Sequence, residues 1–357
     1  MNYKKILLLL YIPLLAACVN AKVIDDLTIV TVGGIDHQND EMIFIVTSPR
    51  FYSESEINDV HQTLHIPKKG NIFEHLNRQS SRPILMGDMD AFLLGKNIAE
   101  AGIFPVMDTL QRNPNIGSRL LLAITEDPLE EFMTAQYGSN GNAIYITNLL
   151  EQNTNYRDLP RSNVHLFASN FFQNDIDAYL PVLKQIDKDT DQTKLEISGM
   201  GIFRNDKLVD ILPAEKLFTF KHLVDRHTNG STSVIVGKHN AVVSSIHSKK
   251  AKIKTDLKKE TLHIQFNSKG VVESYSGEKV DNKTLDKIKK AYNKQLENET
   301  LTILNHFREL NIDPVGIQRK FRQQHRNFNP EKWDELQKNL KIIVDSDITI
   351  TESGTLE

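Results

Sequence analysis

The residues LLGKNIAEAGIFPVMDTLQRNPNIGSRLLLAIT (93–125) place helical patterns between two apolar segments, and this alternation decides the fold class. Leu94, Ile98 and Ala101 recur at three- and four-residue spacing, which is the period of one helix face. Gly102 follows directly and is a typical helix stop. The spacing therefore predicts a short helix that ends at Gly102.

The sequence on both sides of this helix predicts a second helix and several strands. Residues 103–110 continue as another short helix, and 119–125 (RLLLAIT) have the composition of a buried strand. Upstream, 27–36 (LTIVTVGGID) and 42–48 (MIFIVTS) are rich in Val, Ile and Thr and flank the polar residues HQNDE, which predicts two strands joined by a turn. A polar segment follows as far as about Gly70. Strands interleaved with helices predict a mixed α/β domain.

A polar run without periodicity, IDKDTDQT (186–193), is the best candidate for a domain boundary. Beyond it, 195–203 and 208–212 flank the turn residues RNDK and predict a hairpin, and 232–236 and 241–246 predict further strands. A mature chain of about 340 residues exceeds what a single core usually supports, so we expect two or three domains.

The lysine-rich segment SKKAKIKTDLKKETLHIQF (248–266) admits two interpretations. Its charges alternate with less polar residues, as in a sheet with one solvated face (Ile253, Thr255, Leu257, Leu262, Ile264 and Phe266). A surface for nucleic acid or anionic lipid is the alternative, but no aromatic residue is interleaved to stack on bases. We favour the solvated strand.

From Thr284 the apolar period becomes helical, with one stripe formed by Leu285, Ile288, Tyr292, Leu296, Ile303, Leu304, Phe307 and Leu310. This stripe predicts a long amphipathic helix that packs on a sheet. Asn329 and Pro330 then predict a cap and first turn for a helix with Trp333 on its apolar face, where the indole is expected in the core. A last strand is predicted at 342–351.

The first residues have the layout of an export signal. Lys4 and Lys5 precede the apolar run ILLLLYIPLL (6–15), which is too short for the roughly 20 residues that a spanning helix needs. The following LAAC (15–18) fits the bacterial lipobox, in which the cysteine sulfur receives a diacylglycerol and becomes the first residue after cleavage.

We therefore expect residues 1–17 to be a cleaved lipoprotein signal peptide and Cys18 to be lipidated, which tethers the protein to a membrane. A secreted precursor cut near Ala17 or Ala21 is the alternative. Cys18 is the single cysteine, so the mature chain is expected to have no disulfide, thiolate catalyst or thiolate metal site. A formal net charge of −3 gives no global electrostatic reason to bind nucleic acid.

Few residues have the pattern of a reactive site. His61 and His65 are four residues apart, a spacing that could place two imidazoles on one helix face around a metal. No glutamate of the zinc-protease pattern lies between them and no third ligand is indicated, so surface histidines are the better interpretation. His222 and His227, five residues apart, do not share a helix face.

The remaining candidates are weaker. YGSNGN (137–142) is neither GxGxxG nor a P-loop, and we expect a turn that leads into the apolar run 143–146 rather than into a helix. The acidic pairs Asp189/Asp191 and Asp345/Asp347 are expected to be solvated. No catalytic set, cofactor site or metal site is predicted, so the protein is not expected to be an enzyme.

Four sequence blocks cover nearly the whole mature chain in one order. KVIDDLTIVTVGGID (22–36) ends in Gly-Ile-Asp, and 93–125 contains a helix ending in Ala-x-x-Gly-Ile and an Arg-Asn-Pro turn. LEISGMGIFRNDKLVDIL (195–212) joins Ser-Gly-x-x-x-Phe to an Asp-Lys-Leu-Val turn, and 311–336 contains Asp-x-x-Gly, phenylalanine and Pro-x-x-Trp. Together these blocks resemble the Ger(x)C family, the lipoprotein C subunits of nutrient germinant receptors in endospore-forming bacteria.

The resemblance implies an α+β protein with three mixed α/β domains, each a sheet packed with helices. We place these domains at 18–190, at 195–258 (β-rich) and at 259–353 (with the long helix). It also implies a lipid anchor on the outer face of the spore inner membrane, two integral membrane partners (A-type and B-type receptor subunits) and a role in spore germination.

On this basis we expect a non-enzymatic scaffold or coupling subunit. Val19 and Asn20 stand where the family often has a tryptophan, and Pro314 and Gln318 replace an apolar residue and a glycine or glutamate, so the fit to partner subunits can differ. A lipid-anchored solute-binding protein of a transporter is the alternative, and it would need a deep cleft between two similar lobes. A membrane-bound hydrolase is less favoured.

Overall fold

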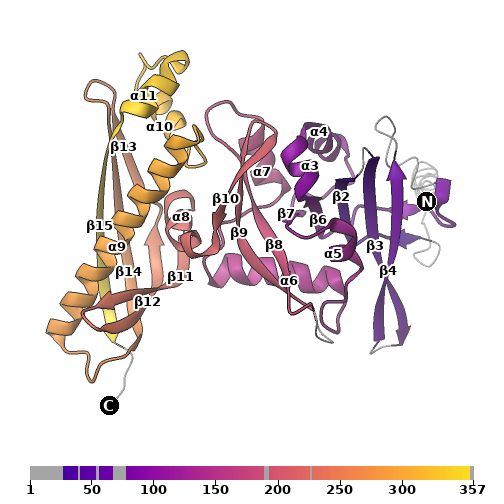
Figure 1. Cartoon of the computed structure of the whole chain (residues 1–357), viewed down its shortest axis with the longest axis horizontal. Coiled ribbons are helices and arrows are strands. Elements are labelled where there is room, and N and C mark those ends of the chain that lie inside the picture. The colour runs from indigo at the N-terminus through magenta and orange to yellow at the C-terminus, as the bar shows by residue number, and fades with distance from the viewer. Residues whose placement is uncertain are drawn as a thin grey trace, which may run out of the picture.

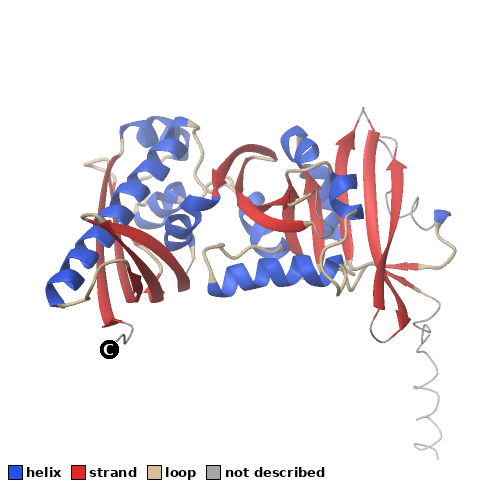
Figure 2. Cartoon of the chain, turned by 60° about the horizontal axis from the view of Figure 1, so that its bottom comes forward, coloured by secondary structure: helices blue, strands red, loops and turns tan. Residues whose placement is uncertain are grey.

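Two large β-sheets lie side by side along the long axis of the molecule (Figure 1). The computed structural model describes residues 27–38, 41–53, 56–66, 78–188, 193–225 and 227–353. Helices pack against both sheets, and the longest helix lies across the C-terminal one (Figure 2). This mixed α/β architecture confirms the expected packing of sheets with helices.

The N-terminal sheet is mixed, with parallel strands at its centre. Among the described residues its order is β10 (Lys207–Pro213), β9 (Lys194–Arg204), β8 (Tyr179–Ile186), β7 (Leu121–Thr125), β6 (Ala91–Gly95), β2 (Val32–Gln38), β3 (Glu41–Ser53) and β4 (Glu56–Ile66). β2, β6, β7 and β8 pair in parallel, and the outer strands pair antiparallel. β6 is a buried apolar run because helices cover both faces of the sheet.

The helices of this region divide between two cores. The first core contains Phe92 and Leu94, and it is covered by α3 (Lys96–Ala101), α4 (Phe104–Arg112) and α7 (Val164–Phe171). The second contains Leu93 and Ile45 on the opposite face, under α5 (Leu129–Thr134) and α6 (Asn142–Tyr156). A separate parallel pair joins β1 (Thr28–Ile29) to β5 (Ile84–Leu85).

The C-terminal sheet is built around its longest strand, β14 (Thr261–Tyr275). The other strands are β11 (His227–Val236), β12 (His239–Lys249), β13 (Lys252–Asp256) and β15 (Lys341–Ser353). β12 and β13 pair antiparallel with successive parts of β14, and β15 pairs with it in parallel. β14 alternates buried and exposed residues, so the predicted solvated face of this sheet is confirmed.

The predicted long helix is α9 (Asn282–Glu309), and its apolar stripe lies on the C-terminal sheet against β15 and β11. The buried residues of the stripe are Ile288, Tyr292, Leu296, Thr300, Ile303, Leu304 and Phe307. Asp281 caps the helix, because its Oδ1 accepts from the Thr284 N–H at 2.8 Å. Burial of each large apolar side chain contributes about 1.5–3 kcal/mol, so this stripe holds α9 in place.

Shorter helices complete the C-terminal region: η2 (Ala214–Lys216), α8 (Leu217–Val224), α10 (Ile317–Gln324), η3 (Pro330–Lys332) and α11 (Trp333–Asn339). The Asn329 side chain accepts from the Glu331 N–H at 3.0 Å, and Trp333 is 7% exposed. The predicted cap and the predicted core position of the tryptophan are therefore confirmed.

One local prediction is wrong, and one segment expected only to be polar also contains a strand. Residues 137–142 do lead into a helix, because α6 begins at Asn142, and its first N–H donates to the Asp59 carboxylate on β4. The segment expected to be polar up to Gly70 contains the edge strand β4. The cap of α6 comes from a distant part of the chain, which a local pattern does not reveal, whereas β4 pairs with the directly preceding strand β3.

Both predicted domain boundaries fall inside a sheet. β8 pairs with β9, so the predicted hairpin, present as β9 and β10, extends the N-terminal sheet across residues 190–195. β13 and β14 pair across residues 258–259. The chain instead passes from one sheet to the other between Pro213 and His227, where α8 lies. The number of domains stays a prediction.

Candidate functional site at the junction of the two sheets

α8 lies between the two sheets and is buried along nearly its whole length, from Leu217 to Leu223. A helix without a polar face belongs in the interior of a protein. The ring of Phe220 lies edge-on to Tyr179 of β8 at 5.1 Å and to Phe307 of α9 at 5.9 Å. Such aromatic pairs contribute about 0.5–1.5 kcal/mol beyond their buried area. Phe220 therefore connects the N-terminal sheet to α9.

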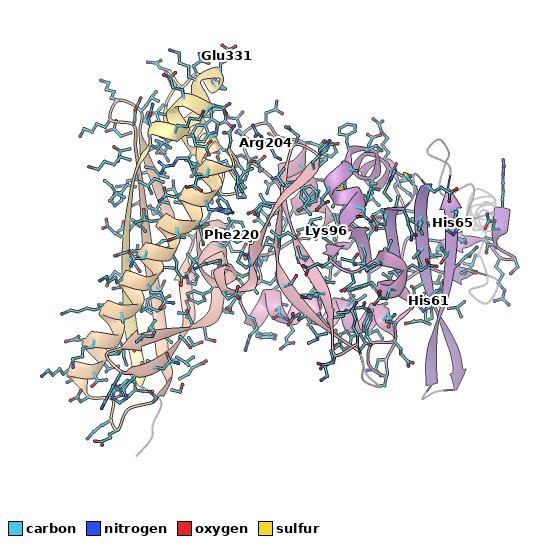
Figure 3. All side chains as sticks on the ribbon, viewed as in Figure 1. His61, His65, Lys96, Arg204, Phe220 and Glu331 are labelled. Carbon is cyan, nitrogen blue, oxygen red and sulfur yellow. The ribbon has the colours of Figure 1, made fainter. Side chains whose placement is uncertain are left out.

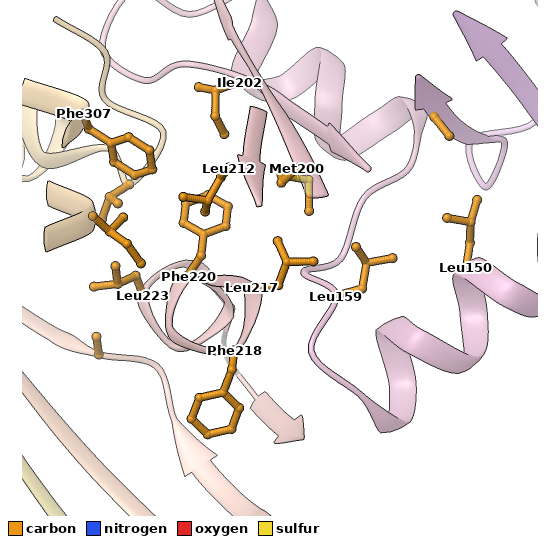
Figure 4. Close-up of a cluster of buried hydrophobic side chains, with 14 of the residues drawn as sticks. Leu150, Leu159, Met200, Ile202, Leu212, Leu217, Phe218, Phe220, Leu223 and Phe307 are labelled. Carbon is orange, nitrogen blue, oxygen red and sulfur yellow. The ribbon is translucent and has the colours of Figure 1, made fainter. Parts of the chain in front are cut away.

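Apolar side chains from both sheets surround α8 (Figure 4). Those labelled are Leu150 of α6, Leu159, Met200 and Ile202 of β9, Leu212 of β10, Leu217, Phe218, Phe220 and Leu223 of α8, and Phe307 of α9. They belong to one buried cluster that extends from α5 and α6 to α9 and α11. Separating the sheets would expose this cluster to water, which opposes their relative movement.

Lys221 brings a positive charge into the junction. Its side chain is 2% exposed, and Nζ donates to the carbonyl oxygens of Thr154 and Arg157 at 2.6 Å each. These carbonyls lie at the C-terminal end of α6, where helix carbonyls lack intrahelical partners and have partial negative charge. Burial lowers the pKa of Lys221, and the carboxylates of Asp225 and Asp158 oppose that shift.

Two buried carboxylates accompany Lys221. Asp225 Oδ2 accepts from the Arg161 N–H at 3.1 Å. Asp158 lies against Gly230 of β11, where φ is +136° and a Cβ would collide with the carboxylate. Glycine at this position therefore permits β11 to approach the end of α6. Burial raises the pKa of both carboxyl groups, while Lys221 lowers it.

A second contact joins the loop before β8 to the loop between α9 and α10. The Asp313 N–H donates to Asp177 Oδ2 at 2.6 Å, and the Asp177 N–H donates to the Asp313 carbonyl oxygen at 3.1 Å. The Asp313 carboxylate accepts from the N–H groups of Ile317 and Gln318 at 2.8 and 2.7 Å. Asp313 thus caps α10 with its carboxylate and contacts the loop before β8 with its backbone N–H and carbonyl groups.

Burial raises the pKa of both carboxyl groups in this contact. The pKa of Asp177 rises to about 6, although the Asp313 N–H and Arg204 oppose the shift. The pKa of Asp313 rises to about 7, because burial outweighs its backbone donors and the charge of Asp177 adds to the effect. The two carboxyl groups therefore change protonation near neutral pH.

An ion-pair cluster and a glycine lie next to this contact. Asp175, 8% exposed at its side chain, pairs with Arg319 at 3.1 Å and with Arg322 at 2.6 Å. Gly316 has φ of +75°, and a Cβ there would lie 3.0 Å from Ile176 Cδ1. The Asp-x-x-Gly motif at 313–316 thus holds α10 against the loop before β8.

The motif residues of the N-terminal sheet also form contacts between elements. Asp36 Oδ1 accepts from the Ile98 N–H at 3.0 Å and so supplies a cap for α3 from β2. A Cβ at Gly95 would collide with that carboxyl group. The Ile103 N–H donates to the carbonyl oxygen of Asp206 in the β9–β10 turn at 2.8 Å. These residues stabilise the fold.

Cys18 and residues 1–17 lie outside the described residues. His61 and His65 lie on β4, where residues four apart share a strand face (Figure 3). His61 is half-buried with Nδ1 3.0 Å from Thr47 Oγ1, and the exposed His65 lies 3.5 Å from Glu41. In the part of the chain that the structure describes, no cluster of three His, Cys, Asp or Glu side chains could hold a metal.

A surface hollow of about 710 Å³ lies along α6, and all its lining residues belong to 137–156. One helix and its preceding loop therefore form the whole wall. A smaller hollow of about 250 Å³ lies beside Asp59 and His61. Neither hollow lies between the two sheets.

Lys221 and His222 were not identified as junction residues from the sequence. His222 is 1% exposed, its Nδ1 lies 2.8 Å from the Phe218 carbonyl oxygen, and burial lowers its pKa to about 4. The available signal was the apolar residues on every side of this pair in LFTFKHLV (217–224). A helix apolar all round predicts that its charged residues are buried as well.

Within the described ranges, the structure contains no helix long and apolar enough to cross a membrane. Two family models match the chain: "Spore germination protein N-terminal domain" over residues 20–185 and "Spore germination B3/GerAC like, C-terminal" over residues 198–354.

Two curated proteins are similar to the chain over nearly its whole length. It is 26% identical to the spore germination protein GerQC of Bacillus cereus, over 99% of each chain. It is 23% identical to the putative spore germination protein YfkR of Bacillus subtilis strain 168, over 99% of this chain and 97% of that one. The crystal structure of the GerBC protein matches 90% of this chain and 97% of its own, with a TM-score of 0.60 and 18% identity, and so has the same fold.

Proposed function

The chain belongs to the Ger(x)C family of spore germination proteins, and from this premise we propose that it is a lipid-anchored, non-enzymatic C subunit of a nutrient germinant receptor. In this role it couples two integral membrane subunits, of the A and B types, on the outer face of the spore inner membrane. Membership of the family supports a role in spore germination, and the coupling role is our inference.

The observation that carries the proposal is that the residues of the family's motifs have structural roles. Asp36 caps α3, Asp313 caps α10 next to Gly316, and Gly102, with φ of +131°, packs so closely against Asp206 that a Cβ would lie 2.7 Å from its carboxylate. Asp313 and Gly316 lie at the junction, which is a buried, hydrogen-bonded connection between two unlike sheets, whereas Asp36, Gly102 and Asp206 stabilise the N-terminal sheet region. A rigid connection of this kind suits a protein that transmits force or position between partners. Two unlike sheets give no support to the solute-binding alternative, which needs two similar lobes.

The proposal is tested in spores that carry Cys18→Ala. After a high-salt wash, which removes electrostatic contacts, we expect loss of the protein from the membrane fraction, and we expect loss of germination with the nutrients that depend on this receptor. The control is Lys184→Ala, an exposed change on β8 that leaves the lipobox intact. Full germination without membrane association would contradict the tether. Unchanged germination with every nutrient after deletion of the gene would contradict the receptor role.

A further inference from the structure

Six exposed lysines gather at one end of the C-terminal sheet, and we name this surface the basic tip: Lys252, Lys254, Lys258, Lys259, Lys338 and Lys341. Lys252 and Lys254 lie on β13, and Lys258 and Lys259 lie in the turn that joins β13 to β14. The Lys341 N–H donates to the Glu260 carbonyl oxygen at 2.9 Å, so the end of α11 and the start of β15 lie beside that turn. The tip occupies the upper left of the molecule, close to α11 (Figures 1 and 3).

The stretch 252–260 of the basic tip has four lysines against two acidic residues, Asp256 and Glu260, and so keeps an excess of positive charge. Among the described residues, none of the tip's six ammonium groups forms an ion pair. Asp256, the last residue of β13, accepts from the N–H groups of Lys258 and Lys259 at 3.0 and 3.1 Å and so orders the turn backbone, and Glu260 is the acidic residue within the turn. The whole chain has a formal net charge of −3, so this surface opposes the sign of the molecule.

α10 occupies the free edge of β13. Gln324 Oε1 accepts from the Thr255 N–H at 2.9 Å, and Gln324 Nε2 donates to the Ile253 carbonyl oxygen at 3.0 Å. The side-chain amide thus takes the place of a neighbouring strand. A partner peptide cannot add to the sheet where these groups are already paired. The basic tip therefore presents side-chain charge rather than backbone hydrogen bonds.

The composition of the tip selects the class of partner. Cores of protein interfaces are depleted in lysine, and their hot spots are enriched in Trp, Tyr and Arg. Single-stranded nucleic acid needs aromatic stacking platforms, which the tip lacks. Clustered lysines instead match a diffuse anionic surface, where each one adds about fivefold in affinity at low salt. We propose that the basic tip binds the anionic phospholipid headgroups of a membrane.

This contact goes beyond the proposed receptor role, because it assigns a second site of membrane association. The N-terminal sheet lies at the other end of the long axis from the basic tip (Figure 1). The chain reaches the N-terminal sheet region at β1, ten residues after Cys18, so a lipid on Cys18 and headgroups at the tip would attach two separate regions of the protein to the membrane. The junction would then lie between two points of attachment.

The test uses residues 18–357 with Cys18→Ser, so that no acyl chain contributes, and measures co-sedimentation with vesicles. Vesicles of phosphatidylcholine are compared with vesicles that also contain phosphatidylglycerol, at low and high salt. The tip variant is Lys252→Gln/Lys254→Gln/Lys258→Gln/Lys259→Gln. The matched control replaces four exposed lysines in the N-terminal half of α9: Lys283→Gln/Lys287→Gln/Lys290→Gln/Lys294→Gln.

We expect binding only to the phosphatidylglycerol vesicles, a loss of at least tenfold in the tip variant and less than twofold in the control. The double variant Lys338→Gln/Lys341→Gln should lose an intermediate amount, and it leaves β13 unchanged. Equal losses in tip variant and control, or no preference for phosphatidylglycerol, would overturn the proposal. Tip-dependent binding to polyglutamate that is tighter than binding to vesicles would also overturn it, in favour of an acidic protein partner. Because Cys18 is absent, failure here leaves the receptor role untouched.

Discussion

The two hydrogen-bonded contacts across the junction use buried charges of opposite sign. At α8, burial lowers the pKa of the Lys221 ammonium group, but two helix carbonyls and two carboxylates face it and partly compensate this effect. At the α9–α10 loop, the carboxyl group of Asp313 faces a second carboxyl group, Asp177. Backbone N–H groups partly compensate this repulsion.

This difference indicates that the two contacts respond differently to solution conditions. The carbonyl oxygens that accept from Lys221 do not titrate, so this contact does not depend on the ionisation of its hydrogen-bond acceptors. Two facing carboxyl groups with raised pKa values weaken their contact when both become ionised. We therefore expect the Lys221 contact to be the permanent one and the Asp177–Asp313 contact to be adjustable by pH.

The largest expected effect is the loss of the Lys221 contact. Lys221→Met keeps most of the side-chain volume but leaves two helix carbonyls and two carboxylates without their cation. We expect the free energy of unfolding to fall by about 3 kcal/mol, the size found when one partner of a buried charge pair is removed. Urea unfolding followed by the fluorescence of Trp333, the single tryptophan, measures it.

The matched control is Lys184→Met, which changes an exposed lysine of β8 and should cost less than about 0.5 kcal/mol. If Lys221→Met were no more destabilising than this control, the buried ammonium group would not be a main stabiliser of the junction.

The second effect concerns pH. The carboxyl of Asp313 has a pKa of about 7 in the folded protein against an ordinary value near 3.8, so the folded state binds more protons in that window. Stability therefore falls as pH rises from about 4 to about 7. We expect Asp313→Asn to be less stable than wild type at pH 5 but to lose about 2 kcal/mol less between pH 5 and pH 7. Urea unfolding at pH 5, 6, 7 and 8 gives the slope of the unfolding free energy against pH for wild type and for Asp313→Asn.

A second titrating group must be separated from this effect. His222 has a folded pKa of about 4, below its ordinary 6.5, so its contribution is lost as pH falls below about 6.5. This contribution is common to wild type and Asp313→Asn and cancels when their slopes are compared. Parallel slopes would exclude Asp313 as the group that makes the junction sensitive to pH.

The smallest effect tests the close packing at the end of the Asp-x-x-Gly motif. Gly316→Ala and Gly237→Ala both place a Cβ at positive φ, +75° and +66°, and share the strain of that conformation. Only Gly316 has a neighbour, Ile176, 3.0 Å from the new Cβ, whereas Gly237 has open space around it. We expect Gly316→Ala to be more destabilising by about 1 kcal/mol. Equal losses would mean that the loop before β8 yields to the added methyl group.

Regular elements were predictable where the apolar pattern is local. The stripe on α9 and the alternation in β14 are periodic over many residues, so one face of each could be assigned to the core. The start of α6 was not predictable, because its cap is Asp59, 83 residues earlier in the chain. The hairpin of β9 and β10 was predicted, but its place in the N-terminal sheet depends on its pairing with β8.

In the candidate site, too, the sequence identified some residues, but only the structure showed what they contact. The four sequence blocks identified the family, and Asp36, Asp313 and Gly316 were among their residues. Their structural roles were hidden, because a motif gives residue types and spacing without the partner. Lys221 belongs to none of the four blocks, and although the apolar residues around it indicate burial, only the structure shows that it joins α8 to the end of α6.

The sequence by itself determined the α+β composition, the long amphipathic helix and the family. Each of these depends on periodicity or on residue order, which are properties of neighbouring positions. The tertiary structure decided which strands share a sheet, which charges are buried, and which residues meet across the junction. The deciding hydrogen bonds join residues 62 positions apart at Asp36 and Ile98 and 136 positions apart at Asp177 and Asp313. Such contacts form only when the chain is folded, and no local pattern encodes them.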